Sequence, residues 1–419
     1  MSDLRQRLLS QLRAIRAVDC HSHTMLSSTY AQCSHDLFDL MCYFERDFQG
    51  ARGMPSAEAY RSAASDAEKW TVLRGVLDEC RNVSYWRHNI VTYQELFGLQ
   101  DPELTNANWA AVNDAIRLRT ARPDWYRHVT EDRCNLETQV RNIPWFEDWE
   151  PRYFTAVLRM EPALELHDAG TRERLQEHLD RELSSLAQVK EGLTALIDRY
   201  RARGSVGIKL AHAYQRTLAS EDVPDAVAEA LFADALTGRE LSTLEIRRLQ
   251  DNIIFFLARS AGELGQVFEI HTGTQANWGH IPDSDPLHLI PLLRANPRTR
   301  FGLYHGGYPY SREIGMLGKH FPNVWLNMAW MYVVTMEGSR RSLSEWLDLV
   351  PANRILGFGS DVTFPEMVLS HLVMARSCIA DVLAKKVERD FLSEECAFDL
   401  CHKLMRDNAM ALYGLTPRE

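Results

Sequence analysis

Two histidines separated by one residue stand at the end of a short apolar run near the start of the chain. The run, residues 15–18, leads into Asp19-Cys20-His21-Ser22-His23. On a β-strand, residues i and i+2 point to the same face, so the imidazoles of His21 and His23 could hold one metal ion from one side. A His-x-His pair also arises by chance on surface strands. A metal site therefore requires further ligands elsewhere in the chain.

Four later apolar runs each carry one residue of a type that serves metal sites. They are Lys209 in the run 206–210, His271 at the end of 267–271, His305 at the end of 301–305 and Asp361 at the end of 355–361. Imidazoles and carboxylates are natural ligands of zinc, manganese, iron and nickel. Burial lowers the pKa of a lysine, and the resulting amine can react with CO2 to give a carbamate that bridges two cations.

Two of these residues also have plainer interpretations. Asp361 could cap a helix that begins near Pro365. Lys209 could form a buried ion pair, or bind substrate as a cation. Both alternatives stay open on the sequence alone.

The elements that would position these residues alternate between strands and helices. Eight apolar runs are predicted strands: residues 15–23, Asn135–Val140, Tyr153–Met160, Ser205–Leu210, Val267–Gly273, Arg300–Gly306, Asn323–Met328 and Arg354–Asp361. The alternation predicts an α/β fold with a parallel sheet, and eight strands fit a (β/α)8 TIM barrel better than a doubly wound open sheet. In such a barrel the C-terminal ends of all strands share one face, which would bring the candidate residues together.

Two spacers are too long for simple crossovers between strands. Residues 25–130 have an almost wholly helical, aromatic-rich pattern, and we predict a helical insertion after strand 1 that covers the active-site face. Residues 212–262 form a second insertion between strands 4 and 5. The chain, residues 1–419, is predicted to be a single TIM-barrel domain.

The composition is that of an ordinary soluble globular protein, with 45% hydrophobic and 25% charged residues. A net charge of −10 argues against nucleic-acid or anionic-membrane partners. No apolar run of the sequence approaches the length of a membrane span, and the N-terminus lacks a signal-peptide pattern. The eight cysteines contain no C-x-x-C, which excludes a zinc knuckle of that type. We expect a cytoplasmic protein with a small-molecule substrate, and a homo-oligomer is left open.

The set of candidate ligands resembles that of the amidohydrolase superfamily, in its branch of TIM-barrel metal-dependent hydrolases (amidohydrolase 2-like). The resemblance covers roughly residues 15–23 and 130–419, including a tail, residues 405–415, similar to the family's terminal helix. It implies that His21 and His23 bind a first metal with Asp361, that His271 and His305 bind a second, and that carboxylated Lys209 bridges them. The resemblance implies two Zn2+ ions, with Mn2+, Fe2+ or Ni2+ as alternatives. The long gap from Lys209 to His271 departs from better-known members.

The leading hypothesis is a metal-dependent hydrolase. A metal-activated hydroxide would attack an amide, ester or related carbonyl of a small molecule, with Asp361 as proton shuttle and with Lys209 and His305 acting through the metals they hold. The alternative is a non-hydrolytic member of the same superfamily, a carboxylate decarboxylase or a uronate-type isomerase. One metal with unmodified Lys209 would favour this alternative. Redox chemistry with two irons and a non-catalytic binding protein are further options.

Aromatic and arginine side chains shortly after the strands are candidates for substrate contacts. They are Tyr214, Arg216, Trp278, Tyr308, Arg312 and Trp330. An arginine in this position could bind a substrate carboxylate bidentately. Each of these side chains could instead serve packing or the rim of the barrel.

Overall fold

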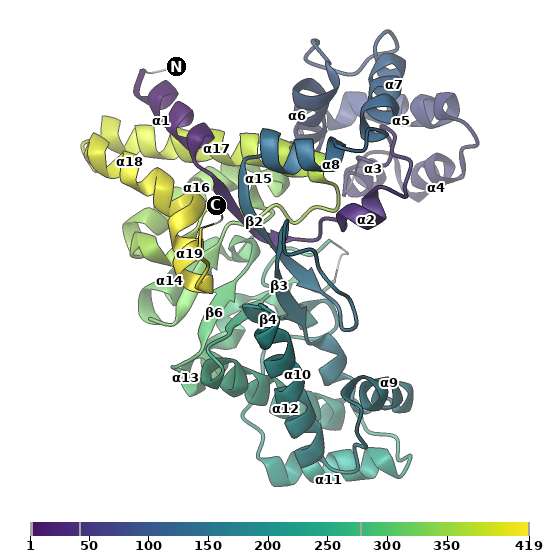
Figure 1. The fold of residues 1–419 in the computed structure, drawn as a ribbon, viewed down its shortest axis with the longest axis vertical. Coiled ribbons are helices and arrows are strands. Elements are labelled where there is room, and N and C mark those ends of the chain that lie inside the picture. The colour runs from purple at the N-terminus through teal and green to yellow at the C-terminus, as the bar shows by residue number, and fades with distance from the viewer. Residues whose placement is uncertain (1–2, 42, 277–278, 418–419) are drawn as a thin grey trace. The chain divides into compact units, whose positions relative to one another are not determined.

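The eight strands of the protein form one sheet with the order expected of a barrel. The computed structural model describes residues 3–41, 43–276 and 279–417. The strands follow one another in the order β1 to β8, and the pairs from β2 to β8 are parallel. They are β1 Ala17–Ser22, β2 Leu136–Ile143, β3 Phe154–Arg159, β4 Gly207–Leu210, β5 Val267–Ile270, β6 Arg300–Leu303, β7 Val324–Asn327 and β8 Ile355–Leu356 (Figure 1). With helices around the sheet, the fold is a (β/α)8 TIM barrel, as the sequence predicts.

Several strands end earlier than their apolar runs. The sequence predicts that the eighth strand reaches Asp361, but β8 ends at Leu356. Likewise β5 ends at Ile270, so that His271 follows the strand instead of ending it. The backbone explains part of the difference, because His305 and Asp361 have positive φ angles, which no strand ladder accommodates. His23, His271, His305 and Asp361 therefore follow the strands, whereas His21 and Lys209 lie on β1 and β4.

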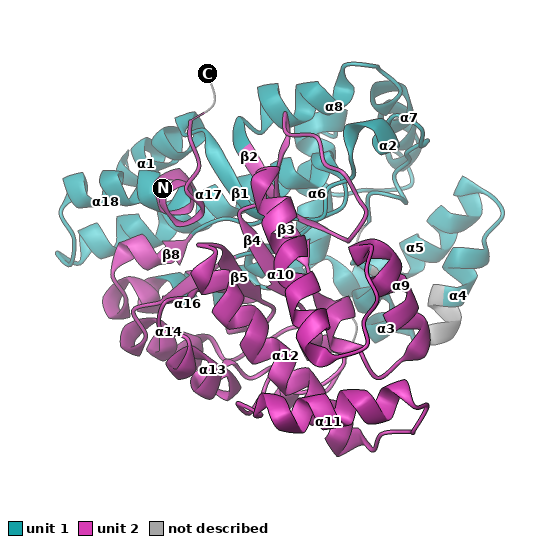
Figure 2. Ribbon diagram, turned by 60° about the horizontal axis from the view of Figure 1, so that its bottom comes forward, with its two compact units in different colours: residues 1–137, 329–343, 357–405 teal, residues 138–328, 344–356, 406–419 magenta. Residues whose placement is uncertain are grey.

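The chain divides into two compact units (Figure 2). Unit 1 comprises residues 1–137, 329–343 and 357–405, and unit 2 comprises residues 138–328, 344–356 and 406–419. Each unit is described below by itself.

In unit 1 the segment between β1 and β2 is helical, as the sequence predicts. Its helices are α2 Ser27–Tyr30, α3 Glu45–Arg52, α4 Met54–Ser62, α5 Asp66–Cys80, α6 Ser84–Phe97, α7 Trp109–Thr120 and α8 Trp125–Arg127. A new helix starts at α5, where the side chain of Ser65 caps it by accepting the N–H of Glu68 at 3.3 Å. That this segment covers the active-site face stays a prediction.

The remaining helices of unit 1 include a long core helix, α17 Pro365–Glu388. It is apolar enough to pass a length-and-composition test for a membrane span, but 83% of its most apolar window is buried inside the protein, as in the core helix of a globular fold. It packs against α1 Asp3–Ala14 and α6. The other helices are α15 Met331–Val334 and α18 Glu394–His402.

Unit 2 contains the crossover helices that follow β3 to β6. They are α9 Ala169–Leu179, α10 Leu186–Ala202, α11 Asp225–Leu236, α12 Thr243–Glu263, α13 Ile290–Ala295 and α14 Ser311–His320, with α19 Asn408–Tyr413 near the C-terminus and α16 Met336–Leu349 shared with unit 1 (Figure 1). A capping box between Ser242 and Glu245 starts α12. Gly207 allows β4 to approach β5, because a Cβ there would lie 2.6 Å from the carbonyl oxygen of Val267.

Candidate metal centre and its surroundings

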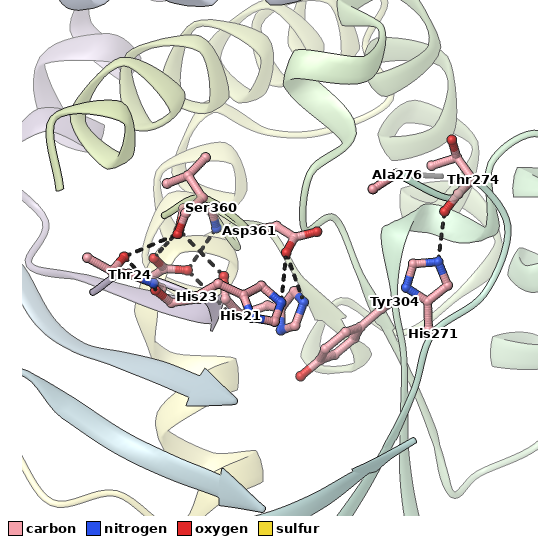
Figure 3. A network of polar contacts seen from close by, with 12 residues as sticks. His21, His23, Thr24, His271, Thr274, Ala276, Tyr304, Ser360 and Asp361 are labelled. Atoms are coloured by element: carbon pink, nitrogen blue, oxygen red, sulfur yellow. Dashed lines mark hydrogen bonds and ion pairs between the residues drawn. The ribbon is translucent and has the colours of Figure 1, made fainter. Parts of the chain in front are cut away.

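Unit 1 brings three of the predicted ligands together. His21 lies on β1, His23 follows that strand, and Asp361 stands in the segment that follows β8 in the chain. The Nε2 atoms of His21 and His23 each lie 3.2 Å from Oδ1 of Asp361 (Figure 3). One ligand atom from each of the three side chains lies within 4.8 Å of the others.

A cation fits this geometry. A neutral imidazole nitrogen with its lone pair toward a carboxylate oxygen would be repelled, so each Nε2 must either carry a proton or share a cation with Asp361. Two imidazoles and a carboxylate are the donor set of catalytic zinc sites with an open position, and also of non-haem iron sites. His21 and Asp361 are buried, whereas the side chain of His23 is 33% exposed. The three residues suit a divalent metal without selecting one.

The carboxylate of Asp361 is held by a backbone conformation that L-residues rarely adopt. Its φ angle is +54°, and such a conformation costs on the order of 1–3 kcal/mol. The N–H of Asp361 donates to the carbonyl oxygen of His21 at 2.9 Å. The preceding residue, Ser360, donates its N–H at 2.8 Å and its hydroxyl at 2.5 Å to the two carboxylate oxygens of Asp19. Burial raises the pKa of Asp19 to about 7, and the hydrogen bonds from Ser360 and from the His21 N–H oppose that rise.

In unit 2, His271 and His305 lie together after β5 and β6. Their ring centroids are 4.2 Å apart. Nε2 of His271 lies 2.8 Å from the carbonyl oxygen of Thr274 (Figure 3). Because a carbonyl oxygen only accepts, Nε2 carries the proton and Nδ1 bears the lone pair. His305 is fully buried, with a φ angle of +61°. The pair could serve a metal or a substrate, and its binding of a second metal stays a prediction.

Lys209 is buried in unit 2 beside an aromatic ring and a carboxylate. Its Nζ lies 3.4 Å from the centroid of the Tyr304 ring, within the range of a cation–π interaction. Glu269, its register partner on β5, is completely buried and accepts the hydroxyl of Tyr413 at 2.7 Å. Burial raises the pKa of Glu269 to about 7, although Lys209 and the two tyrosine hydroxyls oppose the rise. The ring face and the carboxylate attract a cation at Nζ, whereas burial opposes its charge, so carboxylation of Lys209 stays a prediction.

The two arginines predicted to contact substrate are engaged elsewhere in unit 2. The guanidinium of Arg216 is largely buried, lies 2.5 Å from Asp251, and donates to the carbonyl oxygen of Ala219 at 2.9 Å. The side chain of Arg312 is 81% exposed and pairs with Glu345 at 2.9 Å. Neither placement favours recognition of a substrate carboxylate.

The aromatic candidates have mixed surroundings. Tyr214 packs against His271 with ring centroids 4.7 Å apart, and its hydroxyl accepts the N–H of Ala276 at 3.1 Å. Trp330 is buried in unit 1, 5.2 Å from the ring of Tyr43. Tyr308 is half-buried and precedes Pro309. Trp278 lies outside the described residues, and substrate contact by any of the four stays a prediction.

A cavity of about 460 Å3 in unit 2 was not predicted from the sequence. Residues just beyond the C-terminal ends of β2 and β3 line it, together with Gln215 from the loop after β4. Arg159, the last residue of β3, lines the cavity and holds Glu161 through Nε at 3.1 Å and Nη2 at 3.2 Å. The volume of the cavity lies within the range of small-molecule sites, roughly 300–1,000 Å3. The signal that could have identified Arg159 is its place at the end of a predicted strand.

Comparisons with known proteins are consistent with a TIM barrel that carries a metal site. Residues 255–415 match the family model described as Amidohydrolase. The chain is 27% identical over 354 residues to the uronate isomerase of Nostoc punctiforme, with 76% of this chain and 73% of that protein covered. It is also 27% identical over 221 residues to the protein fluG of Emericella nidulans, with 50% of this chain covered but only 26% of the longer fluG protein.

The likeness to a solved structure concerns the fold. The uronate isomerase from Thermotoga maritima superimposes with a TM-score of 0.84 at 15% identity, and the superposition covers 99% of this chain and 98% of that one. The likeness therefore includes the helical segment between β1 and β2 as well as the strands. The partial Amidohydrolase match, this fold and the His21, His23 and Asp361 group are all consistent with the amidohydrolase superfamily.

Proposed function

We propose that the protein is a metal-dependent isomerase of a uronate, a sugar that carries a carboxylate. The observation that carries the proposal is the group His21, His23 and Asp361, whose donor atoms converge as a catalytic metal requires. The resemblance to uronate isomerases over most of their length supports this reaction over hydrolysis. Support for a hydrolase extends only to the superfamily.

The surroundings of Lys209 support a centre with one metal. A bridging carbamate is what would favour a second ion, and the Tyr304 ring and Glu269 instead favour the ammonium form of Lys209. A single metal would polarise a sugar oxygen. Isomerisation needs no activated water as a reactant, because it moves one hydrogen between neighbouring carbons of the sugar and one proton between the oxygens that those carbons carry.

Proton transfer to and from the substrate would be carried out by side chains of the protein. His271, with its Nε2–H committed to Thr274, offers Nδ1 as the basic atom at its ring. His305 lies against that ring, so the two imidazoles could take up and return a proton.

A uronate carboxylate requires a cation in the substrate pocket, and Arg159 is our candidate. It stands at the end of β3 and lines the cavity of about 460 Å3. A guanidinium binds a carboxylate through two parallel hydrogen bonds. Glu161, which holds the Nε and Nη2 side of the guanidinium, would orient it toward the substrate.

The test is a direct assay of the purified chain loaded with Zn2+. Glucuronate and galacturonate are incubated with the enzyme in D2O, and proton NMR follows both the product and the exchange of carbon-bound hydrogen. We expect conversion of at least one uronate, with one metal per chain by elemental analysis. The variant Asp361→Asn, with similar volume but without the anionic ligand, should lose both metal and turnover.

Two results would overturn the proposal. One is a fully metal-loaded enzyme that leaves every uronate unchanged. The other is hydrolysis of amides, esters or lactones by an enzyme that holds two metals, which would restore the hydrolase hypothesis.

A further inference from the structure

Ser360, the residue before the ligand Asp361, has its backbone N–H, carbonyl and hydroxyl all engaged by buried groups of unit 1. Its N–H and hydroxyl donate to Asp19 at 2.8 Å and 2.5 Å. Its carbonyl oxygen lies 2.8 Å from Nδ1 of His371, a fully buried residue of α17. Ser360 is therefore held from β1 on one side and from α17 on the other.

The histidine in this arrangement has a defined tautomer. Because the carbonyl oxygen of Ser360 can only accept, Nδ1 of His371 carries the proton. Its Nε2 has no hydrogen-bond partner among the described residues. The rings of Tyr332, Phe358 and His88 lie around the imidazole, with centroids 5.7 Å, 5.6 Å and 5.7 Å away. The buried imidazole thus makes one polar contact, which is directed at the residue next to the ligand.

The backbone of Asp361 needs such support. Its φ angle of +54° is unfavourable for a residue with a Cβ, and a strained conformation persists only where its surroundings over-determine it. The conformation also lets the N–H of Asp361 reach the carbonyl oxygen of His21 at 2.9 Å. Release of Ser360 would allow the turn to relax and would carry the carboxylate away from the two imidazoles.

We propose that His371 is a positioning residue for the metal: together with Asp19 it clamps Ser360 and so holds Asp361 in the conformation that presents its carboxylate to His21 and His23. The proposal rests on the metal centre of the proposed function. It concerns groups that do not touch the metal and that act only through Ser360.

The experiment compares variants by their affinity for Zn2+ and by the visible spectrum of the Co2+-loaded protein. His371→Leu removes the hydrogen bond to Ser360. His371→Asn keeps a donor, because its amide nitrogen can occupy the place of Nδ1. His88→Leu is the control for packing. His88 is also buried, its ring lies 5.7 Å from that of His371, and its Nε2 lies 2.9 Å from the carbonyl oxygen of Met367, so the variant alters the surroundings of His371 without removing the bond to Ser360.

We expect His371→Leu to bind Zn2+ about 10- to 100-fold more weakly, the usual effect of losing a group that orients a ligand. Its Co2+ bands should shift, because the ligand geometry changes. His371→Asn should recover most of the affinity. His88→Leu should lose thermal stability to a similar extent and keep the affinity and spectrum of the unmodified protein.

Wild-type affinity and spectrum in folded His371→Leu would overturn the proposal, as would an equal loss of affinity in His88→Leu. If His371→Leu does not fold, Ser360→Ala provides the test, since it removes the hydroxyl bonds to Asp19 at 2.5 Å and to the carbonyl oxygen of His21 at 3.5 Å. An unchanged Co2+ spectrum in Ser360→Ala would then refute the clamp. These readouts are independent of turnover, so an enzyme that binds Zn2+ but isomerises no uronate would refute the proposed reaction and not the clamp.

Discussion

The ammonium of Lys209 lies 3.4 Å from the centroid of the Tyr304 ring, and its register partner on the neighbouring strand is the buried Glu269. The ring face and the carboxylate both stabilise positive charge at Nζ. The sequence left open whether Lys209 is carboxylated, paired or a substrate-binding cation. The form of Lys209, and with it the number of metals, stays a prediction that the variant Lys209→Met tests.

Replacement of Lys209 by methionine should therefore affect stability more than metal content. Loss of the lysine leaves the buried carboxylate of Glu269 without the nearby cation, but that carboxylate can take up a proton. The free energy of unfolding should therefore fall by only about 2 kcal/mol at neutral pH. Urea unfolding measures this cost, and elemental analysis should find one zinc per chain in both proteins. Lys386→Met is the control, because Lys386 is also buried over an aromatic ring, with Nζ 4.5 Å from the centroid of Phe391. A fall from two zinc ions to one in Lys209→Met would instead indicate a bridging carbamate.

Removal of one metal ligand should abolish the stabilisation that metal provides. A ligand that binds only the folded state at 100 times its dissociation constant adds about 2.7 kcal/mol. We expect Zn2+ to raise the thermal midpoint of the unmodified protein, a chelator to reverse that rise, and His23→Ala to show neither effect. His128→Ala is a matched control, since the side chains of His23 and His128 are 33% and 30% exposed and His128 also lies beside a carboxylate, that of Asp132. An equal zinc effect in His23→Ala would remove His23 from the metal centre.

The candidate ligands could be predicted from sequence because each signal is local. His21, His23, His271, His305 and Asp361 stand at or just after the ends of apolar runs, and the barrel follows from the alternation of those runs with helices. The strand ends were less predictable. Positive φ angles at His305 and Asp361 depend on tertiary contacts, such as the bond from Ser360 to Asp19, 341 residues away in the chain.

The substrate contacts were the hardest part to predict, because an arginine in a loop gives the same local signal whether it binds substrate or a carboxylate of the protein. Arg216 pairs with Asp251, 35 residues later, and Arg312 pairs with Glu345, 33 residues later. No periodicity connects such partners. The contact of Lys209 with Tyr304 is likewise non-local, although each residue lies in a run that was predicted as a strand.

Loss of Arg159 should weaken substrate binding more than it slows the chemical step. A guanidinium that binds a carboxylate contributes about 1.5–3 kcal/mol of binding free energy per charged hydrogen bond. Arg159→Met should therefore raise KM for a uronate about 10- to 100-fold, with a smaller change in kcat. Steady-state kinetics separates the two constants. Arg239→Met is the control, because the side chains of Arg159 and Arg239 are 39% and 40% exposed and both are in ion pairs with carboxylates of the protein. A KM unchanged in Arg159→Met would exclude Arg159 from carboxylate recognition.

Acid should destabilise the protein partly through His212. This imidazole is fully buried without a hydrogen-bond partner among the described residues, and burial, with a smaller effect of Arg216, lowers its pKa to about 3. The unfolded chain, with an ordinary histidine pKa of about 6.5, binds the proton first, so the folded state loses stability as pH falls below 6.5. Between pH 6.5 and pH 5 the protonation of His212 in the unfolded chain should lower the free energy of unfolding by about 2 kcal/mol. We expect His212→Leu to match the unmodified protein at pH 7 and to lose about 2 kcal/mol less by pH 5 in urea unfolding. Parallel losses in the two proteins over this range would show that His212 is protonated in the folded state or does not contribute.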